Sequence, residues 1–211
     1  MRSDQTARDN LIKTMLFLHS RGWCDGTGGN FSVCLQHDPL QLLMAPSGVD
    51  KGSVQAEELI VVDANGAVIE GNGRASAETE LHQCIMSSVG AGAVLHTHSV
   101  AATVLSRVHG CDGFVQLEGW EMLKGLNGIK SHETTLALPV VANNQDMKQL
   151  SASVKPHLHE PAWGILVAGH GLYAWGESLE QARRHVEIIE FLLSAHLHYQ
   201  QLRNTTDQIK L

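Results

Sequence analysis

Apolar positions recur at helical spacing in two long segments, one near each end of the chain. In residues 3–22 and 178–201 they fall every three or four positions, as on the buried face of an amphipathic helix. Gly22 fits the end of the first helix, because glycine is common just after a last helical turn. Shorter helices are predicted in the middle of the chain, at residues 78–86 (after Ser76 as an N-cap), 99–107, 118–126 and 144–154.

Short apolar runs bounded by turn residues predict strands. The clearest hairpin joins residues 59–62 to residues 67–70 through Asp63-Ala64-Asn65-Gly66. The other predicted strands are residues 31–35, 40–44, 93–95, 135–141, 163–168 and 172–175. Strands outnumber the helices between them and come in pairs. We therefore predict an α/β fold of the α+β type, with a mostly antiparallel central sheet flanked by helices, in a single domain over residues 1–211.

Composition and charge narrow the class of protein. The 211 residues are 43% hydrophobic and 18% charged, which is ordinary for a globular domain. The net charge is -7 and no block of Lys or Arg is present, so neither a nucleic acid nor an anionic membrane surface is an expected partner. The sequence has no targeting signal, no apolar run long enough for a membrane span, and four cysteines without a C-x-x-C pair. These features predict reduced thiols and a cytoplasmic location.

Thirteen histidines are the unusual feature of the composition. His96 and His98 end an apolar strand, where residues i and i+2 point to the same side and can bind one metal ion. Imidazole is a favoured zinc ligand, although two unrelated histidines would give the same spacing. His196 and His198 share this spacing in a predicted helix, where i and i+2 point about 200° apart and cannot bind one ion.

His170 is the third candidate ligand because glycine flanks it on both sides. Glycine permits a sharp turn that aims the imidazole inward, whereas an exposed hairpin tip is the alternative interpretation. His82, one helical turn from Glu78, could support the metal ligands, but a polar helix face is the favoured interpretation. Five other histidines have no second histidine at ligand spacing, and we expect surface or capping roles for them: His19, His37, His109, His132 and His185. His157 and His159 have the spacing but lie in a less regular region, so they are only weak candidates for metal binding.

A glycine-rich turn supplies a candidate phosphate site. Thr27, Gly28, Gly29 and Asn30 combine a permissive backbone with hydroxyl and amide donors, an arrangement that suits an anion. Each such turn alone is equally typical of a plain loop. Additional donors of the same kind are Ser47, Gly48 and Ser76.

Proton transfer next to a metal-bound carbonyl requires an acid and a base, and glutamates are available for both roles. Residue types and spacing alone do not choose among Glu78, Glu80, Glu118 and Glu121.

Five motifs taken together resemble the class II aldolase/adducin family, in the order seen in that family and over nearly the whole chain. They are Thr27-Gly28-Gly29-Asn30-Phe31-Ser32, Ala45-Pro46-Ser47-Gly48, Ser76-Ala77-Glu78, His96-Thr97-His98 and Gly169-His170-Gly171. Residues 90–99, 121–126 and 169–177 are most similar to sugar-phosphate dehydratases within that family.

The resemblance implies a site and an activity. It implies one zinc ion per subunit on His96, His98 and His170, phosphate binding by residues 27–30 with Ser47, Gly48 and Ser76, and a catalytic Glu121. It also implies a homotetramer with active sites near subunit boundaries.

Two departures from the family pattern concern residues 76–78. The aldolases have Ser-Ser-Glu there, so one phosphate hydroxyl is missing. Glu78 matches the aldolases' catalytic glutamate, which leaves open how Glu78 and Glu121 share the acid and base roles.

The expected function is zinc-dependent dehydration of a small sugar phosphate. An aldolase or epimerase would use the same metal-stabilised chemistry. A non-catalytic adducin-like interaction domain is expected to lack the three histidines that this chain has.

Overall fold

The computed structural model describes residues 2–158 and 162–209. Its α-helices are α1 (Arg2–Ser20), α2 (Thr79–Val89), α3 (Val100–Val108), α4 (Met147–Val154) and α5 (Leu179–Ile209). Its strands are β1 (Asn30–His37), β2 (Leu40–Met44), β3 (Ile60–Asp63), β4 (Val68–Glu70), β5 (Ala93–Thr97), β6 (Phe114–Leu117), β7 (Leu136–Val141), β8 (Gly164–Val167) and β9 (Gly171–Gly176). Three short 3-10 helices are η1 (Ala56–Glu58), η2 (Glu121–Gly125) and η3 (Lys155–His157).

The strands form one nine-stranded sheet in the order β4-β3-β2-β1-β5-β9-β8-β7-β6. Neighbouring strands are antiparallel except β7 and β8, which run parallel. In the centre of the sheet, Asn30 of β1 and Tyr173 of β9 pair with His96 of β5 from either side. The prediction of an α/β fold with a mostly antiparallel sheet is confirmed.

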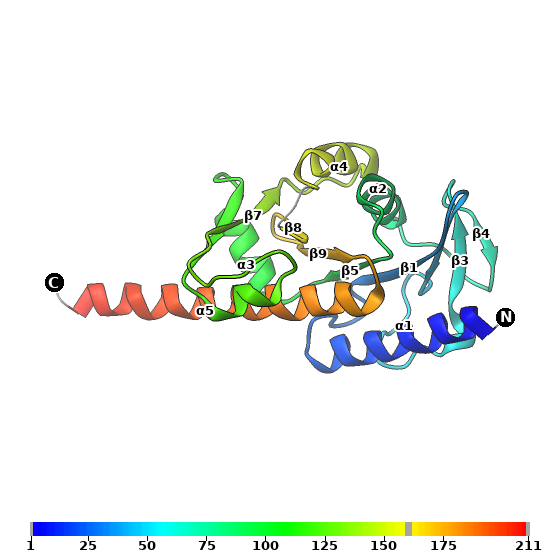
Figure 1. Ribbon diagram of the computed structural model, residues 1–211, viewed down its shortest axis with the longest axis horizontal. Helices are drawn as coiled ribbons and strands as arrows, with labels where there is room; N and C mark the ends of the chain where they lie inside the picture. Colours follow the sequence, from blue (N-terminus) through cyan, green and yellow to red (C-terminus); the bar gives the residue numbers. More distant parts are fainter. Residues whose placement is uncertain (1, 159–161, 210–211) are drawn as a thin grey trace.

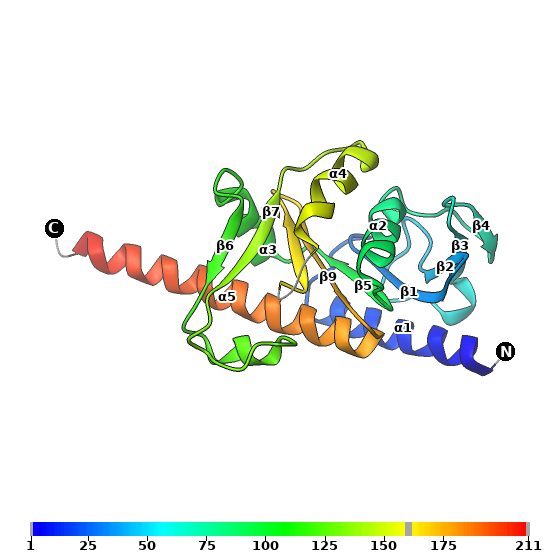
Figure 2. The same cartoon turned by 45° about the horizontal axis from the view of Figure 1, so that its top comes forward.

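Helices cover both faces of this sheet. Helices α2 and α4 lie on one face, and α1 and the first half of α5 lie on the other (Figures 1 and 2). The C-terminal half of α5 continues past the sheet and projects from the body of the protein (Figure 1). Among the described helices, none has the length and apolar character needed to cross a membrane.

The core lies between the sheet and the helices on each face. Phe31 and Leu95 pair across β1 and β5 and are fully buried, as is Ile85 on α2. Burying each such side chain contributes roughly 1.5–3 kcal/mol, so these contacts fix the position of β5, which ends in the histidines. All four cysteines are free, as predicted.

Two local predictions differ from the structure. The segment at residues 118–126 is not an α-helix but contains the 3-10 helix η2, bracketed by Gly119 and Gly125; glycine disfavours a helix interior. Strand β6 was not predicted, because only four residues alternate between exposed and buried positions, too few for a clear strand pattern.

Candidate metal centre

Strand β5 brings His96 and His98 together. His96 is fully buried within the strand, and His98 lies one residue beyond its end. Their Nε2 atoms are 2.7 Å apart, as the i, i+2 spacing predicted.

His170 joins them from the turn between β8 and β9. Its Nε2 atom lies 3.2 Å from that of His96. Gly169 has φ +66°, and a Cβ at Gly171 would overlap the carbonyl of Thr97, so the turn requires glycine on both sides. Thr103 also donates a hydrogen bond of 3.0 Å to the His170 carbonyl. The turn is therefore held against the domain and is not a free hairpin tip.

The three imidazoles fit a metal ion. Their ligand atoms lie within 4.8 Å of one another. His96 Nδ1 is 2.9 Å from the carbonyl of Leu172, so a proton on Nδ1 donates there and leaves the Nε2 lone pair facing the other rings. Burial lowers the pKa of His96 and of His98, which keeps both rings neutral, as metal ligands must be.

Glu78 places a carboxylate beside these nitrogens from the N-cap of α2. Its Oε1 lies 3.2 Å from Nε2 of His170 and 3.7 Å from Nε2 of His96. Asn30 donates a hydrogen bond to Oε2. Burial opposes the ionisation of Glu78, but its hydrogen bond with His170 holds the pKa of this carboxyl below its usual value. Glu78 is thus positioned either to complete a metal site or to act as a base there.

Two ring side chains pack behind the candidate ligands: Tyr173, which no local pattern singles out, and His82, for which a polar helix face was the favoured interpretation. The Tyr173 ring stacks on His96 with centroids 3.9 Å apart. His82, predicted on a polar face, is fully buried, with Nδ1 2.6 Å from Ser32 Oγ. Its face of α2 packs on β1, a contact that helical spacing alone did not reveal.

The glycine-rich loop lies directly against the histidines. A Cβ at Gly28 would come within 2.7 Å of His98 Nδ1, and one at Gly29 within 2.7 Å of the His96 carbonyl oxygen. Both glycines are therefore needed for this close approach. Thr27 begins the loop, and Asn30 reaches Glu78 as described above.

The other phosphate-site candidates are linked to the same region. The backbone N–H of Ser47 donates to Arg74, and the backbone N–H of Glu78 donates to Ser76 Oγ. Gly48 adopts φ +80°. The structure thus connects these loops to the segment that carries Glu78, while their binding of phosphate stays a prediction.

Glu121 does not contact His96, His98 or His170 of its own chain. Its side chain is 68% exposed and contacts Lys124 and His132 on the surface. Its catalytic role therefore stays a prediction, and that role requires another copy of the chain or a movement to bring Glu121 to a metal site.

The other histidines do not join the candidate metal group, within the part of the chain that the structure describes. His196 and His198 lie on α5, where helical geometry separates their side chains. The surface or capping prediction for His185 is wrong: it is buried, and its Nδ1 lies 2.7 Å from the carbonyl of Trp175, because α5 packs this face against β9. His157 ends η3, and His159 lies outside the described residues.

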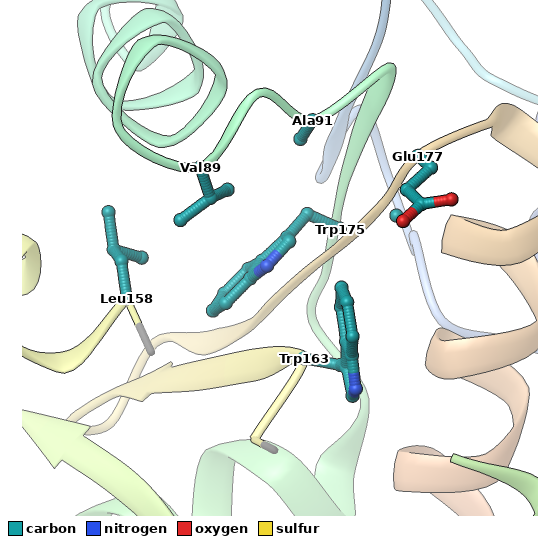
Figure 3. A pocket seen from close by; sticks show the side chains of 7 residues that line it. Val89, Ala91, Leu158, Trp163, Trp175 and Glu177 are labelled. Carbon is teal, nitrogen blue, oxygen red and sulfur yellow. The ribbon is translucent and has the colours of Figure 1, made fainter. Parts of the chain in front are cut away.

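A cavity of about 110 Å³ lies near the other end of β9. Figure 3 shows that Trp163 and Trp175 line it together with Val89 and Leu158, and that Glu177 is its one carboxylate. This lining has no cluster of metal ligands, so the histidine end of β5 is the candidate site.

Comparison with known proteins agrees with this fold. The family model "Class II Aldolase and Adducin N-terminal domain" matches residues 9–197, and the chain belongs to this family. A relative named methylthioribulose-1-phosphate dehydratase from Sorangium cellulosum is 44% identical over 191 residues, covering 89% of each chain. One with the same name from Pseudoalteromonas translucida is 41% identical over 203 residues, covering 93% of each chain.

Solved structures support the same relationship. An L-fuculose-1-phosphate aldolase from Thermus thermophilus is 26% identical, has a TM-score of 0.76, and covers 97% of this chain and 99% of its own. YgbL from Klebsiella pneumoniae, described as a putative aldolase/epimerase/decarboxylase, is 26% identical with a TM-score of 0.78; the match covers 91% of this chain and 88% of YgbL.

Proposed function

We propose that this enzyme dehydrates 5-methylthioribulose 1-phosphate to 5-methylthio-2,3-dioxopentyl phosphate, a step of methionine salvage and hence of methionine biosynthesis. The observation that carries the proposal is the convergence of three Nε2 atoms, from His96, His98 and His170, beside the Glu78 carboxylate. It occurs in a chain more than 40% identical to relatives named as this dehydratase.

Zinc is the proposed metal, one ion per subunit, held by the same three histidines. Three imidazoles with an open position are typical of catalytic zinc, whereas an octahedral, oxygen-rich set would favour magnesium or manganese. When bound, zinc would act as a Lewis acid toward the C2 carbonyl and C3 hydroxyl oxygens of the substrate.

The protein's own groups must then move protons. A base removes the C3 proton, an acid protonates the departing C4 hydroxyl, and loss of water leaves an enol that tautomerises to the 2,3-diketone. Glu121 is the first candidate for these transfers, supplied by a neighbouring copy. Glu78 is the second, and its carboxylate already faces the histidines of its own chain.

A homotetramer would supply that neighbouring copy. A groove of about 1,320 Å³ runs along the projecting half of α5, and residues 118–120, next to Glu121, form part of its lining. Phe114 and Tyr199 in the groove expose 42% and 52% of their surface, as expected of residues that a second subunit covers. We propose a cytoplasmic homotetramer of single-domain chains, residues 1–211, with active sites near subunit boundaries.

The loops around Glu78 are the proposed binding site for the phosphate group of the substrate. Thr27, Gly28, Gly29 and Asn30 are the proposed phosphate cradle, and the additional donors are Ser47, Gly48 and Ser76. Their connection to the segment that carries Glu78 supports this assignment.

The alternative function is a sugar-phosphate aldolase or epimerase. It is favoured by the structural similarity to an L-fuculose-1-phosphate aldolase and by the position of Glu78. Incubation of the purified enzyme with 5-methylthioribulose 1-phosphate and with ketose 1-phosphates separates the two. We expect a diketone from the first and no cleavage of the others; release of dihydroxyacetone phosphate would instead establish the aldolase.

A further inference from the structure

Lys51 is a buried lysine that links two loops of the candidate phosphate site. It is 1% exposed and lies in the turn that follows Ser47 and Gly48. Its Nζ donates one hydrogen bond of 2.9 Å to the Thr27 carbonyl and another of 2.9 Å to the Val49 carbonyl. The ammonium group therefore ties the loop at residues 27–30 to the loop at residues 47–49.

Among the side chains that the structure describes, Lys51 has no direct counterion: none of their carboxylate oxygens lies within 4.0 Å of its Nζ, whose hydrogen bonds go to backbone carbonyls. Burial lowers the pKa of Lys51, and the charges of Asp50 and Glu78 only oppose this effect from a distance. Carbonyl groups solvate an ammonium group but do not neutralise it, and a buried charge without a partner is destabilising.

The position of this charge indicates what neutralises it. Gly28, next to the Thr27 carbonyl, packs against the ring of His98. Ser47, on the other linked loop, bonds to the backbone of Arg74, two residues before Ser76. A phosphate held by these loops would thus lie near both the candidate metal site and the ammonium group.

We propose that Lys51 is a specificity-determining residue: it fixes the two phosphate loops at their working separation and supplies the positive charge that selects a phosphate monoester dianion. This inference rests on the phosphate loops assigned under the proposed function, but it does not depend on which sugar carries the phosphate.

Binding of inorganic phosphate by the intact, zinc-loaded protein tests this proposal without turnover. Lys51→Met removes the charge, Lys51→Arg keeps it, and Lys148→Met is the matched control on the exposed face of α4. Because the interaction of a phosphate with a charged donor is lost, calorimetry should show phosphate affinity about 10- to 100-fold weaker in Lys51→Met. Lys51→Arg should retain more affinity than Lys51→Met, and Lys148→Met should match the wild type.

The kinetic readout separates this role from a merely structural one. In Lys51→Met we expect KM for the phosphorylated substrate to rise at least about tenfold, with kcat within about threefold and zinc content unchanged. Unchanged phosphate affinity in a folded Lys51→Met protein would overturn the proposal, as would a loss of kcat without a change in KM.

If Lys51→Met does not fold, an NMR measurement on the wild-type protein still tests the proposal. A buried ammonium group exchanges its protons slowly, so its ¹⁵N signal is distinguishable from those of the exposed lysines. Phosphate should shift this signal, and an unmoved signal at saturating phosphate would refute the proposal. A protein that binds phosphate through Lys51 but does not turn over 5-methylthioribulose 1-phosphate would refute the proposed function alone.

Discussion

Glu78 Oε1 lies 3.2 Å from Nε2 of His170, the ring nitrogen that also faces His96. Two elements far apart in sequence, the start of α2 and the β8–β9 turn, therefore bring a carboxylate and a metal-binding imidazole together. Asn30 holds the other carboxylate oxygen, so the side chain has a fixed orientation. A group in this position can serve substrate chemistry at the metal without a rearrangement of the fold.

Replacing Glu78 tests its chemical role. Glu78→Gln preserves the shape of the side chain but removes its capacity to accept a proton. We expect kcat to fall by about 10²–10⁴-fold, the usual contribution of a general acid or base, with zinc content maintained. Glu80→Gln, two residues along the chain, is the control and should retain wild-type activity. Full activity in Glu78→Gln would exclude it as an essential acid or base.

Glu121 tests whether the active site is shared between copies. Glu121→Gln should lower kcat with zinc content unchanged, and His170→Ala should be inactive because it loses a metal ligand. Subunits of the two variants, mixed and reassembled, should regain part of the wild-type activity, because one chain then supplies the histidines and the other supplies Glu121. If Glu121→Gln alone keeps full activity, its assignment is wrong. If the mixture stays inactive, the site is not shared.

Metal removal should affect stability as well as activity. His170→Ala should lose most of the zinc that the wild type binds, measured by elemental analysis of purified protein, while His198→Ala on α5 should retain it. Because an ion that binds only the folded state stabilises it, a chelator should lower the Tm of the wild type and leave that of His170→Ala nearly unchanged. Equal zinc content in the two variants would contradict the ligand assignment.

Glu190 predicts a pH dependence of stability. Burial raises its pKa to about 7, although hydrogen bonds from Ser99 and Thr97 oppose this effect. The folded state therefore holds a proton that the unfolded state releases above its ordinary pKa, 4.5. Its contribution to stability is complete below about pH 4.5 and is lost as the pH rises toward 7, with a total change of about 3 kcal/mol.

Denaturant unfolding at several pH values measures this effect. The free energy of unfolding of the wild type should decrease from pH 5 to pH 8 more than that of Glu190→Gln, which cannot ionise. Glu187→Gln, a partly exposed neighbour on α5, should follow the wild type. Parallel curves for wild type and Glu190→Gln would contradict the raised pKa.

The sequence predicted the parts of the site that depend on local geometry. His96 and His98 were identified because strand spacing is regular, and His170 became a candidate because glycine on both sides permits a sharp turn. The hairpin of β3 and β4 followed from its turn residues in the same way. Local rules therefore made His96 and His98 a plausible pair and predicted the class of sheet, whereas the family resemblance joined His170 to that pair.

Residues whose roles depend on tertiary contacts were missed or misassigned. Lys51, Tyr173 and Glu190 carry no local signal, because the contacts that define their roles, with Thr27, His96 and Thr97, span 24 or more residues of the chain. His82 and His185 were expected near the surface, but packing of helices on the sheet buries both. A contribution of Glu121 would depend on a second chain, which local sequence rules do not describe.

Turnover of 5-methylthioribulose 1-phosphate by the purified protein, with and without a chelator, tests the account most directly. We predict release of 5-methylthio-2,3-dioxopentyl phosphate, loss of this activity in the chelator, and its return when zinc is restored. Undiminished turnover in protein shown to be free of metal, or no diketone from the zinc-loaded protein, would contradict it.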